Sequence, residues 1–320
     1  MTDNSADWQP GAGLDALRVR AESLATIRRF FATRGVMEVE TPLLASAGVT
    51  DPALEPIRVP CADGERFLQT SPEYAMKRLL AAGSGDIFQI CKAFRAAEVG
   101  RRHNPEYTLL EWYRTGIDHY QLLREVAELL LTLLPHQRWQ VWPYATLFEE
   151  LLAINPFDAE VAVLETIARE QCGEVPPALS RDGWLDLLMS HCIEPAISTW
   201  GIVFVVDYPP SQASLARILP RGECCATAAR FECYVDGVEL ANGYWEETDA
   251  VELKRRFDDD NARLTAAGQP ARCLDPRFMA AMASGLPDCA GVALGLDRLL
   301  ACQLGTRNLS GILAFDWHRS

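Results

Sequence analysis

The first clear pattern along the chain is helical. Apolar residues from Leu14 to Phe31 recur every three to four positions, which predicts a helix over residues 13–34, and Gly35 is a natural stop directly after it. The segment VMEVETP then reads as a short strand closed by Pro42. We therefore expect a helix and a short strand at the start of the fold.

More helices are indicated further along. The second opens at Ser71-Pro72-Glu73, where the serine is placed to cap the helix and the proline to fill its first position. Helical spacing also marks residues 119–134, 158–171, 184–194 and 248–266. Pro-rich breaks separate several of these segments, so each is expected to be a separate helix.

Strand-like runs come in pairs. Residues 86–95 and 107–114 flank a polar loop and predict an antiparallel hairpin with a long tip. Residues 230–235 and 238–242 flank Asp236-Gly237, which is typical of a tight hairpin turn. Further strands are expected over residues 202–207 and 291–294, with a helix over 296–304. Hairpins interspersed with helices predict an α+β fold on a mainly antiparallel sheet.

Length and composition limit the architecture. The chain has 320 residues, 49% of them hydrophobic, and can bury a large core. Residues 1–12 are a short polar leader, and no repeat or linker divides the rest, so residues 13–320 are expected to form a single domain. The 44 acidic and 30 basic residues give a net charge of −14, which disfavours a large nucleic-acid footprint.

The leader has no basic, apolar targeting signal, and no apolar run approaches the length of a membrane span, so we expect a cytoplasmic protein. The ten cysteines include no C-x-x-C pair, and Cys91, Cys233, Cys289 and Cys302 lie in apolar stretches. We interpret them as small buried residues in a reducing compartment, and we expect no zinc site.

The first hairpin holds candidate chemistry. Alternation places Tyr107, Leu109, Glu111 and Tyr113 on one face of its second strand. Arg95 ends the partner strand, and its planar guanidinium could bind carboxylate or phosphate oxygens. For this hairpin alone, a structural ion pair between Arg95 and Glu111 is an equally good interpretation.

The second hairpin gathers carboxylates. Glu232, Glu239 and Glu246 accompany Asn242, and such groups can hold Mg²⁺ on phosphates or an ammonium group. Glu239 has the opposite strand parity to Asn242 and Glu246, so a bulge or strong twist near residues 241–243 is required if all are to converge. Without it, some of the glutamates are simply exposed.

A third segment, GVALGLDRL at residues 291–299, has glycines that allow close approach of a ligand and Arg298 at the start of a helix. Taken in order, RGVMEVETP, SPEYAMKRLL, GDIFQICKAFR with HNPEYTLLEWYR, VELANGYWE and GVALGLDRL resemble the catalytic core of class II lysyl-tRNA synthetases. The match runs from about Leu14 to the C-terminus. It implies a class II aminoacyl-tRNA-synthetase-like catalytic core, with the sheet flanked by helices.

The resemblance is closest to the truncated relatives of that family, the elongation factor P (R)-β-lysine ligases. Full lysyl-tRNA synthetases carry an N-terminal anticodon-binding barrel, whereas only a short leader precedes the first helix here. This and the acidic charge argue against tRNA as a partner. The implied activity is ATP-dependent activation of (R)-β-lysine as its adenylate, followed by transfer to a lysine side chain of elongation factor P.

The resemblance implies a site for ATP and Mg²⁺. Arg95 and Arg298 are the expected catalytic residues, and Arg95 would bridge the substrate carboxylate and the α-phosphate. Tyr107 and Arg298 would enclose adenine from its two sides. Glu232 and Glu239 would carry Mg²⁺. The other expected ATP contacts are Ala96, Ala97, His103, Asn104, Leu240 and Gly295.

The resemblance also implies an amino-acid pocket rich in carboxylates, which suits a dication. Glu73 and Glu111 would receive the amino group nearest the substrate carboxylate. The distal ammonium would meet Tyr113, Asn242, Tyr244 and Glu246. Ser71, Pro72 and Ala293 complete the expected substrate contacts.

Two positions depart from the usual family pattern. The second motif normally reads Arg-x-Glu, but Arg95 is followed by Ala96, Ala97 and Glu98, so adenine contacts are weaker or Glu98 substitutes. Ala293 stands where α-lysine enzymes have glycine, and the β-lysine ligases share this alanine. One added methyl favours the β-amino acid only modestly.

Two other functions remain open at this point. One is a free-standing ligase that activates α-lysine for another acceptor, and the other is a non-catalytic synthetase paralogue that regulates a partner. The resemblance further implies a homodimer formed through residues 30–42, although Phe30 and Phe31 could instead be plain core residues.

Overall fold

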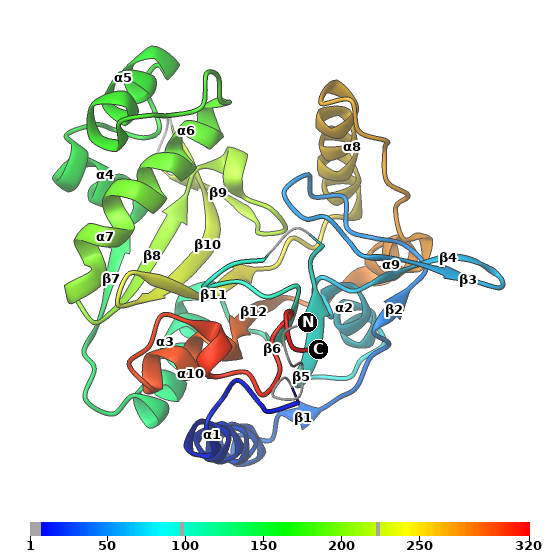
Figure 1. Cartoon of the computed structure of the whole chain (residues 1–320). Helices are drawn as coiled ribbons and strands as arrows, with labels where there is room; N and C mark the ends of the chain where they lie inside the picture. The colour runs from blue at the N-terminus through cyan, green and yellow to red at the C-terminus, as the bar shows by residue number, and fades with distance from the viewer. Residues whose placement is uncertain (1–7, 97–98, 222–224) are drawn as a thin grey trace, which may run out of the picture. The chain divides into compact units, whose positions relative to one another are not determined.

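The computed structural model describes residues 8–96, 99–221 and 225–320. The chain forms two compact units, Met1–Gly116 with Thr248–Ser320 (unit 1) and Ile117–Glu247 (unit 2). In Figure 1, unit 1 comprises the blue to cyan and the orange to red segments, and unit 2 comprises the green to yellow segment. Unit 1 is therefore built from the two ends of the chain and unit 2 from its middle.

The main sheet of unit 1 has the strand order β1-β5-β6-β12. Its strands are β1 (Met37–Glu38), β5 (Ile87–Phe94), β6 (Glu106–Thr115) and β12 (Cys289–Gly295). β1 pairs with β5 in parallel, whereas β5, β6 and β12 pair antiparallel. The helices of this unit are α1 (Leu14–Ala32), α2 (Glu73–Ala81), α8 (Ala250–Ala266), α9 (Pro276–Gly285) and α10 (Leu296–Gln303). A small second sheet has the order β2 (Leu44–Ala45), β4 (Gly64–Leu68), β3 (Arg58–Cys61).

One face of strand β6 packs against apolar side chains, and the opposite face carries candidate site residues. Trp112 is fully buried on the apolar face. Phe31 of α1 stacks on Phe88 with ring centroids 4.5 Å apart and meets Trp112 edge-on at 5.3 Å. This aromatic packing fixes α1 against the sheet and so fixes which way the alternate residues of β6 point.

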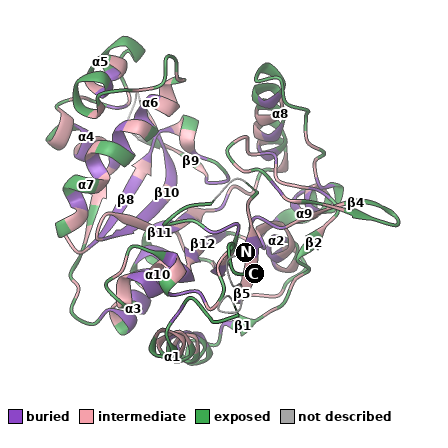
Figure 2. Ribbon diagram, in the orientation of Figure 1, coloured by how far each residue is buried: buried purple, intermediate pink, exposed green. Residues whose placement is uncertain are grey.

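The sheet of unit 2 has the strand order β11-β10-β8-β7, and β9 pairs with β10. The strands are β7 (Trp139–Pro143), β8 (Ile202–Tyr208), β9 (Ile218–Arg221), β10 (Cys225–Val235) and β11 (Val238–Trp245). The α-helices are α3 (His119–Leu133), α4 (Tyr144–Leu152), α5 (Val161–Cys172), α6 (Arg181–Leu188) and α7 (Glu194–Ala196), with a π-helical segment at Met189–Ile193. Most described residues of β8 and β10 are buried (Figure 2), and Val203 and Val205 of β8 and Tyr234 of β10 pack in one cluster with residues of α4 and α6.

The hairpin turn between β10 and β11 follows from its sequence. Asp236 and Gly237 have φ values of +52° and +72°, the left-handed pair that a two-residue hairpin requires. A Cβ atom at Gly237 would lie 2.5 Å from the carbonyl oxygen of Glu194. Glycine is therefore needed at this turn for its conformation and for the close approach of α7.

Most of the long elements predicted from the sequence are confirmed, and so is the α+β fold on a mainly antiparallel sheet. The predicted helix over 184–194 is wrong in detail, because the chain there forms α6, the π-helical segment and the start of α7. The sequence reading did not identify the three-stranded sheet, β7, β9, α4 or α9. These elements are short or lack a strong apolar period.

The start of α2 differs by one residue from the prediction. Pro72 occupies the N-cap position, and Glu73 is the first helical residue. Ser71 still serves the helix start, because its Oγ accepts a hydrogen bond from the Glu73 N–H at 3.3 Å. Within the described ranges, no helix is long and apolar enough to cross a membrane.

Candidate active site

The face of β6 opposite the aromatic core carries the expected polar groups. Glu111 is buried and lies opposite Gln89 of β5 and Ala293 of β12. Tyr113 donates a hydrogen bond from its hydroxyl to Oε1 of Glu111 at 2.8 Å. Tyr113 lies opposite Gly291 of β12. The neighbouring residues on β12, Gly291 and Ala293, are therefore small.

Arg95 and Tyr107 are adjacent at the loop end of the β5–β6 hairpin. The Arg95 guanidinium carbon lies 5.2 Å from the centre of the Tyr107 ring, within cation–π distance. The Tyr107 hydroxyl donates to the carbonyl of Thr70 at 2.8 Å, and the Arg95 N–H donates to the carbonyl of Pro105 at 2.9 Å. The chain just before α2 thus holds the Tyr107 ring, and the Pro105 carbonyl holds the backbone of Arg95.

His103 and Arg298 meet although 195 residues separate them. Arg298 Nη2 lies 2.8 Å from His103 Nε2. Arg298 projects from the first turns of α10, and Gly295 is the N-cap residue of that helix. The loop of the β5–β6 hairpin and the β12–α10 turn therefore lie in contact, as expected from the five sequence segments that carry the family resemblance.

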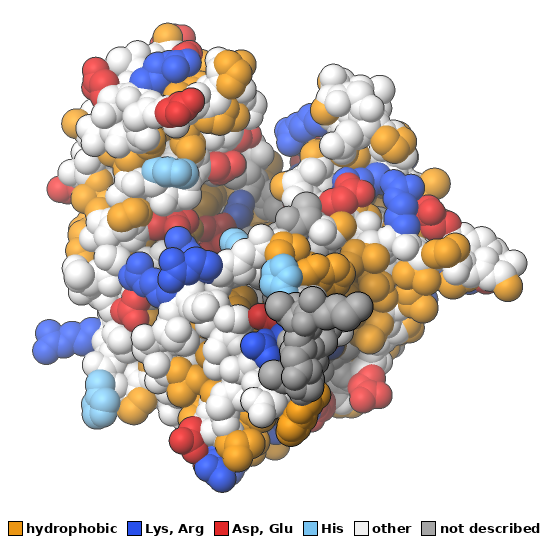
Figure 3. All heavy atoms as spheres, in the orientation of Figure 1, with side chains coloured by type: hydrophobic (Ala, Val, Ile, Leu, Met, Phe, Trp, Pro, Cys, Tyr) orange, Lys and Arg blue, Asp and Glu red, His pale blue; other side chains and the backbone are white. Residues whose placement is uncertain are grey.

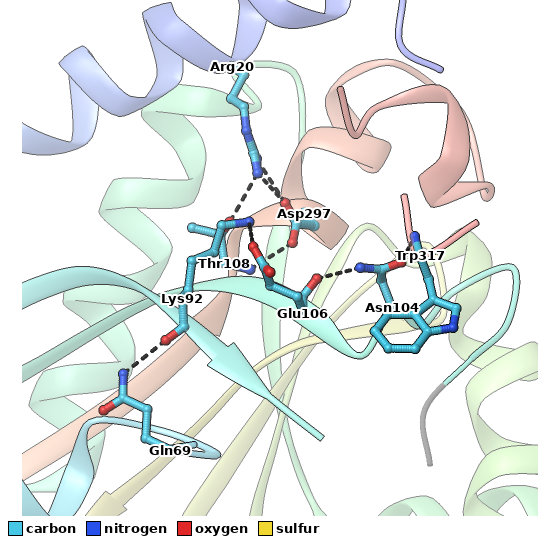
Figure 4. Close-up of polar contacts among 8 residues, drawn as sticks. All are labelled: Arg20, Gln69, Lys92, Asn104, Glu106, Thr108, Asp297 and Trp317. Carbon is cyan, nitrogen blue, oxygen red and sulfur yellow. Dashed lines mark hydrogen bonds and ion pairs between the residues drawn. The ribbon is translucent and has the colours of Figure 1, made fainter. Parts of the chain in front are cut away.

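Asn104 is used to hold the loop in place (Figure 4). Its Nδ2 donates to the carbonyl of Glu106 at 2.6 Å, and its Oδ1 accepts from the backbone N–H of Trp317 at 2.9 Å. Both ends of this buried amide are therefore bonded within unit 1. The C-terminal segment thus helps to fix the loop, and nothing in the sequence pattern pointed to this role.

Asp297, next to Arg298, anchors the start of α10 to β6 and α1 (Figure 4). Its Oδ2 accepts from the Thr108 N–H at 2.8 Å, and its Oδ1 accepts from Nη1 of Arg20 at 2.8 Å. Burial raises the pKa of Asp297, while Arg20 and the Thr108 hydrogen bond lower it. This network orients the helix turn that presents Arg298.

Glu73 pairs with a buried lysine. Oε1 of Glu73 accepts from Nζ of Lys77 at 2.5 Å, one helical turn along α2. The side chain of Lys77 is 1% exposed and that of Glu73 is 20% exposed. A substrate amine at Glu73 would therefore share the carboxylate with Lys77.

A bulge brings the carboxylates of the second hairpin to one face. Glu232 lies opposite Asn242, but Tyr234 lies opposite Glu239, because the register shifts by one residue and leaves Leu240 between the paired positions. Residues 232 and 234 share a face, so their partners share it too. The bulge required by the sequence argument is confirmed, with its extra residue at Leu240.

Glu232 is already surrounded by donors. Its Oε2 accepts from the hydroxyls of Tyr208, at 2.8 Å, and Tyr234. Its Oε1 accepts from Nη2 of Arg230, and this guanidinium also donates from Nε to Oδ1 of Asn242 at 3.3 Å. Both oxygens of Glu232 are therefore engaged by donors in unit 2.

The remaining expected residues of the hairpin lie close by. Tyr244 is opposite Arg230 and so shares the face of Glu232 and Asn242. Glu246 is buried just beyond the end of β11, where it forms an isolated bridge with Ala216. Of the four residues expected for the distal ammonium, Asn242 and Tyr244 therefore lie on β11, and Glu246 follows it directly.

The segment that departs from the second family motif lies only partly within the described residues. The Ala96 N–H donates to the carbonyl of Glu55 at 3.0 Å. Ala97 and Glu98 lie outside the described residues. Whether Glu98 replaces the usual glutamate stays a prediction.

The donor chemistry fits a Mg²⁺ ion that is bound mainly by phosphates. Among the described residues there is no cluster of three or more His, Cys, Asp or Glu that could hold a metal by itself. Glu232 and Glu239 face the same side of the hairpin, and Mg²⁺ commonly takes one or two carboxylates plus phosphate oxygens and water.

The expected residues form two sets. Unit 1 holds Ser71, Pro72, Glu73, Arg95, His103, Asn104, Tyr107, Glu111, Tyr113, Ala293, Gly295 and Arg298. Unit 2 holds Glu232, Glu239, Leu240, Asn242, Tyr244 and Glu246.

Sequence reasoning missed three charged residues in these sets. Lys77, Asp297 and Arg230 were not expected, yet each holds or presents an expected site residue. The Glu73–Lys77 spacing of four on a helix and the Asp297-Arg298 dipeptide were usable signals. No comparable signal marks Arg230, because its role depends on the register of β10.

The comparison with protein families and the comparison with individual proteins agree with each other. Residues 7–318 match the family model described as tRNA synthetases class II (D, K and N). The chain is 44% identical to proteins named "Elongation factor P--(R)-beta-lysine ligase" from Salmonella gallinarum, Salmonella dublin and Salmonella paratyphi B, over 99% of this chain and 99% of each relative. The predicted resemblance is confirmed, and the chain belongs to the class II tRNA synthetase family, alongside these ligases.

Proposed function

We propose that this chain is an ATP-dependent ligase that activates (R)-β-lysine as its adenylate and transfers it to a lysine side chain of elongation factor P. The observation that carries the proposal is the β5–β6 hairpin, where Tyr107 and Glu111 lie on one face of β6 and the guanidinium of Arg95, directly after β5, lies 5.2 Å from the Tyr107 ring. The names of the relatives, at 44% identity over 99% of the chain, support the substrate and the acceptor.

In the first step the amino-acid carboxylate attacks the α-phosphorus of ATP. A bond forms between a carboxylate oxygen and phosphorus, and the bond from that phosphorus to pyrophosphate breaks. The carboxylate is already ionised at neutral pH, so no general base is needed. Arg95 and Arg298 would stabilise the negative charge that accumulates around phosphorus.

ATP is placed by groups of the hairpin loop and the α10 turn. Tyr107 offers its ring to adenine on one side and Arg298 its guanidinium on the other. The His103 contact, at 2.8 Å, positions Arg298, while Asn104 fixes the loop. Ala96, Ala97, Leu240 and Gly295 would supply backbone contacts and space. When bound, Mg²⁺ would neutralise phosphate charge beside Glu239 and Glu232.

The amino acid is held by its two ammonium groups. Glu111, with Tyr113 bonded to it at 2.8 Å, and Glu73 would receive the amino group nearest the carboxylate. Ser71 and Pro72 would line this end of the pocket. Asn242, Tyr244 and Glu246 would receive the distal ammonium together with Tyr113. Ala293 lies opposite Glu111, so its methyl group bears on where the first amino group sits.

In the second step the uncharged ε-amine of the acceptor lysine attacks the carbonyl carbon of the adenylate. A carbon–nitrogen bond forms, the bond to AMP breaks, and the amine loses a proton to give an amide. The chemistry requires the acceptor amine to reach the adenylate on an open side of the site.

We also propose that the enzyme is a homodimer that works in the cytoplasm without tRNA. β1 lies at an edge of its sheet and leaves Met37 48% exposed, next to the exposed Leu43 and Leu44, which is the kind of edge that a partner covers. The described cysteines are free, as in a reducing compartment. The face in Figure 3 carries Lys and Arg interspersed with Asp and Glu, not one continuous basic surface.

The proposal is tested by incubating the purified enzyme with ATP, (R)-β-lysine and elongation factor P, then measuring the mass of elongation factor P. The expected result is a mass increase equal to one β-lysyl group on a single lysine, with AMP formed in proportion. Omission of ATP should abolish both. AMP formation without modification of elongation factor P would show that the acceptor is wrong, and gel filtration would test the dimer.

A further inference from the structure

Unit 2 contains a cavity of about 300 Å³ beside the glutamate pair, at the lower end of the range for small-ligand pockets. Its walls come from α4, α6, α7 and the β10–β11 hairpin. The lining residues that matter here are Tyr144, Asp186, Glu194, Arg230, Glu232 and Glu239. Of the residues proposed above for ATP and amino acid, only Glu232 and Glu239 line this cavity within the described part of the chain.

The charges around the cavity favour a cation. Asp186 and Glu194 line it together with the glutamate pair, against the single guanidinium of Arg230. That guanidinium donates to Glu232, to Oδ1 of Asn242 and, at 2.6 Å, to the carbonyl of Gln212. Because its nitrogens are already bonded, Arg230 offers little to an anion, so a phosphate group without Mg²⁺ would be repelled.

Tyr144 supplies an independent sign that something binds. Its side chain is 1% exposed and lines the cavity. Its hydroxyl makes no hydrogen bond to any described residue, and buried phenols normally have a partner. Burial raises the pKa of Tyr144 well above its usual value, so the group is a neutral hydroxyl whose oxygen can accept a hydrogen bond from a ligand.

The Asp186 carboxylate can accept a further hydrogen bond. Its Oδ1 accepts from Nε2 of Gln212 at 2.8 Å. Within the described chain, no cation lies within ion-pair distance of it. Although solvent reaches Asp186, the surrounding protein desolvates the carboxyl and raises its pKa to about 6, partly offset by Arg230. The carboxylate is therefore ionised at neutral pH.

The wall between Asp186 and Glu194 has an unusual backbone. The chain forms a π-helical turn at Met189–Ile193, and Met189 lines the cavity. Such turns are rare and are frequent at functional sites. Here the turn lies between the two acidic residues, and the thioether side chain of Met189 gives the cavity an apolar side.

We propose that this cavity binds the acceptor lysine side chain of the protein substrate, with its terminal ammonium at Asp186 and Tyr144. This inference rests on the proposed function. An ammonium group has three donors and no acceptor, which matches Asp186, Glu194 and the Tyr144 oxygen, and an unbranched alkyl stem matches Met189. The cavity would hold the acceptor ammonium beside Glu232 and Glu239 until it loses a proton to water and the uncharged amine leaves to attack the adenylate.

The test separates the two reaction steps. ATP–pyrophosphate exchange with (R)-β-lysine measures activation, and transfer of labelled (R)-β-lysine measures the KM for elongation factor P. Asp186→Asn keeps the size and the Gln212 hydrogen bond but loses the charge. It should raise the KM for elongation factor P about tenfold and leave exchange within about twofold of wild type. Tyr144→Phe should act in the same direction with a smaller change.

Asp182→Asn is the matched control, because Asp182 lies on the same helix, accepts a hydrogen bond from Ser211 at 2.7 Å and does not line the cavity. It should leave both steps unchanged. An unchanged KM for elongation factor P in Asp186→Asn would overturn the inference, as would a parallel fall in exchange. A wild-type enzyme without exchange would instead overturn the proposed function.

Discussion

The two hairpins of the candidate site carry their carboxylates in different ways. On β6, simple alternation places Glu111 beside Tyr113 with small residues on the next strand, so the side chains are set by an unbroken register. On β11, a bulge at Leu240 is needed to bring Glu239 to the face of Asn242. The first arrangement follows from strand period alone, whereas the second depends on a local irregularity.

The partners of the carboxylates differ too. Glu111 accepts from a phenol that is itself expected to contact substrate. Glu232 accepts from Arg230, Tyr208 and Tyr234, none of which was expected in the site. We infer that the first hairpin is arranged around the substrate, whereas Glu232 also has a structural task in unit 2.

The largest effect is expected at the first hairpin. Arg95→Ala should lower ATP–pyrophosphate exchange by at least about 1000-fold, because it removes the charge that stabilises the transition state. The melting temperature should stay within a few degrees of wild type. Arg28→Ala, which removes an exposed pair with Glu38, is the control. Retained exchange in Arg95→Ala would show that the arginine is misassigned.

Glu111→Gln should have the next largest effect. It should raise the KM for (R)-β-lysine on the order of 100-fold, because a buried carboxylate that pairs with an ammonium is lost. The KM for ATP should stay unchanged. Steady-state exchange at varied amino acid and varied ATP measures both values, and an equal rise in the two would argue against a specific amine contact.

Glu232→Gln tests whether Glu232 has a structural task in unit 2. It should lower the free energy of unfolding by about 2 kcal/mol, because Arg230 loses its carboxylate partner in a largely buried setting. Urea denaturation monitored by fluorescence measures this. Glu165→Gln, which removes an exposed pair with Arg169 in the same unit, should change stability by less than about 0.5 kcal/mol. Equal effects of the two substitutions would refute a structural task for Glu232.

The next effect depends on pH. With a pKa of about 6, Asp186 loses its charge as the pH falls, so the KM for elongation factor P should rise about fourfold between pH 7.5 and 5.5. Asp182, Arg230 and Glu232 act on the Asp186 carboxyl electrostatically, and Gln212 donates a hydrogen bond to it. Asp186→Asn should remove this part of the pH dependence. A wild-type KM that does not change over this range would contradict the assignment.

The same pKa determines how the contribution of Asp186 to folding stability changes with pH. Because the folded protein binds the Asp186 proton more tightly than the unfolded chain, this group favours folding below about pH 4, and that contribution is lost as the pH rises through about 6. Asp186→Asn should therefore be more stabilising, or less destabilising, at pH 8 than at pH 4. Melting curves at the two values measure the difference, and a change in the opposite direction would contradict it.

The smallest effect is expected at Ala293. Ala293→Gly removes one methyl group opposite Glu111, so the preference for (R)-β-lysine over L-lysine should fall by only about threefold to tenfold. Exchange rates with each amino acid give the ratio. A ratio that stays the same would show that this methyl group does not set the isomer preference.

Strand period and turn chemistry allowed the main strands, their hairpins and the shared strand faces to be predicted, whereas the roles of the site residues were implied by the family resemblance. The shared face of β6 follows from alternation, and the Asp236-Gly237 turn follows from the φ values that these residues tolerate. The need for a bulge in β11 was also visible in the parity of Glu239. Local sequence is sufficient for these features because their geometry is set by neighbouring residues.

The remaining features arise from contacts between distant residues. Asn104 is held by Trp317, and Asp297 by Arg20. The cavity at Tyr144 and Asp186 is formed by helices with no recognisable motif. The positions of these residues become related only when the chain folds, so hydrophobic pattern and motif spacing contain no signal for them.

The decisive measurement is ATP–pyrophosphate exchange by the purified wild-type enzyme. We expect rapid exchange that depends on (R)-β-lysine, with L-lysine much less effective and no exchange without amino acid. Absence of exchange with both amino acids, at saturating ATP and Mg²⁺, would contradict the claim that this chain forms an aminoacyl adenylate.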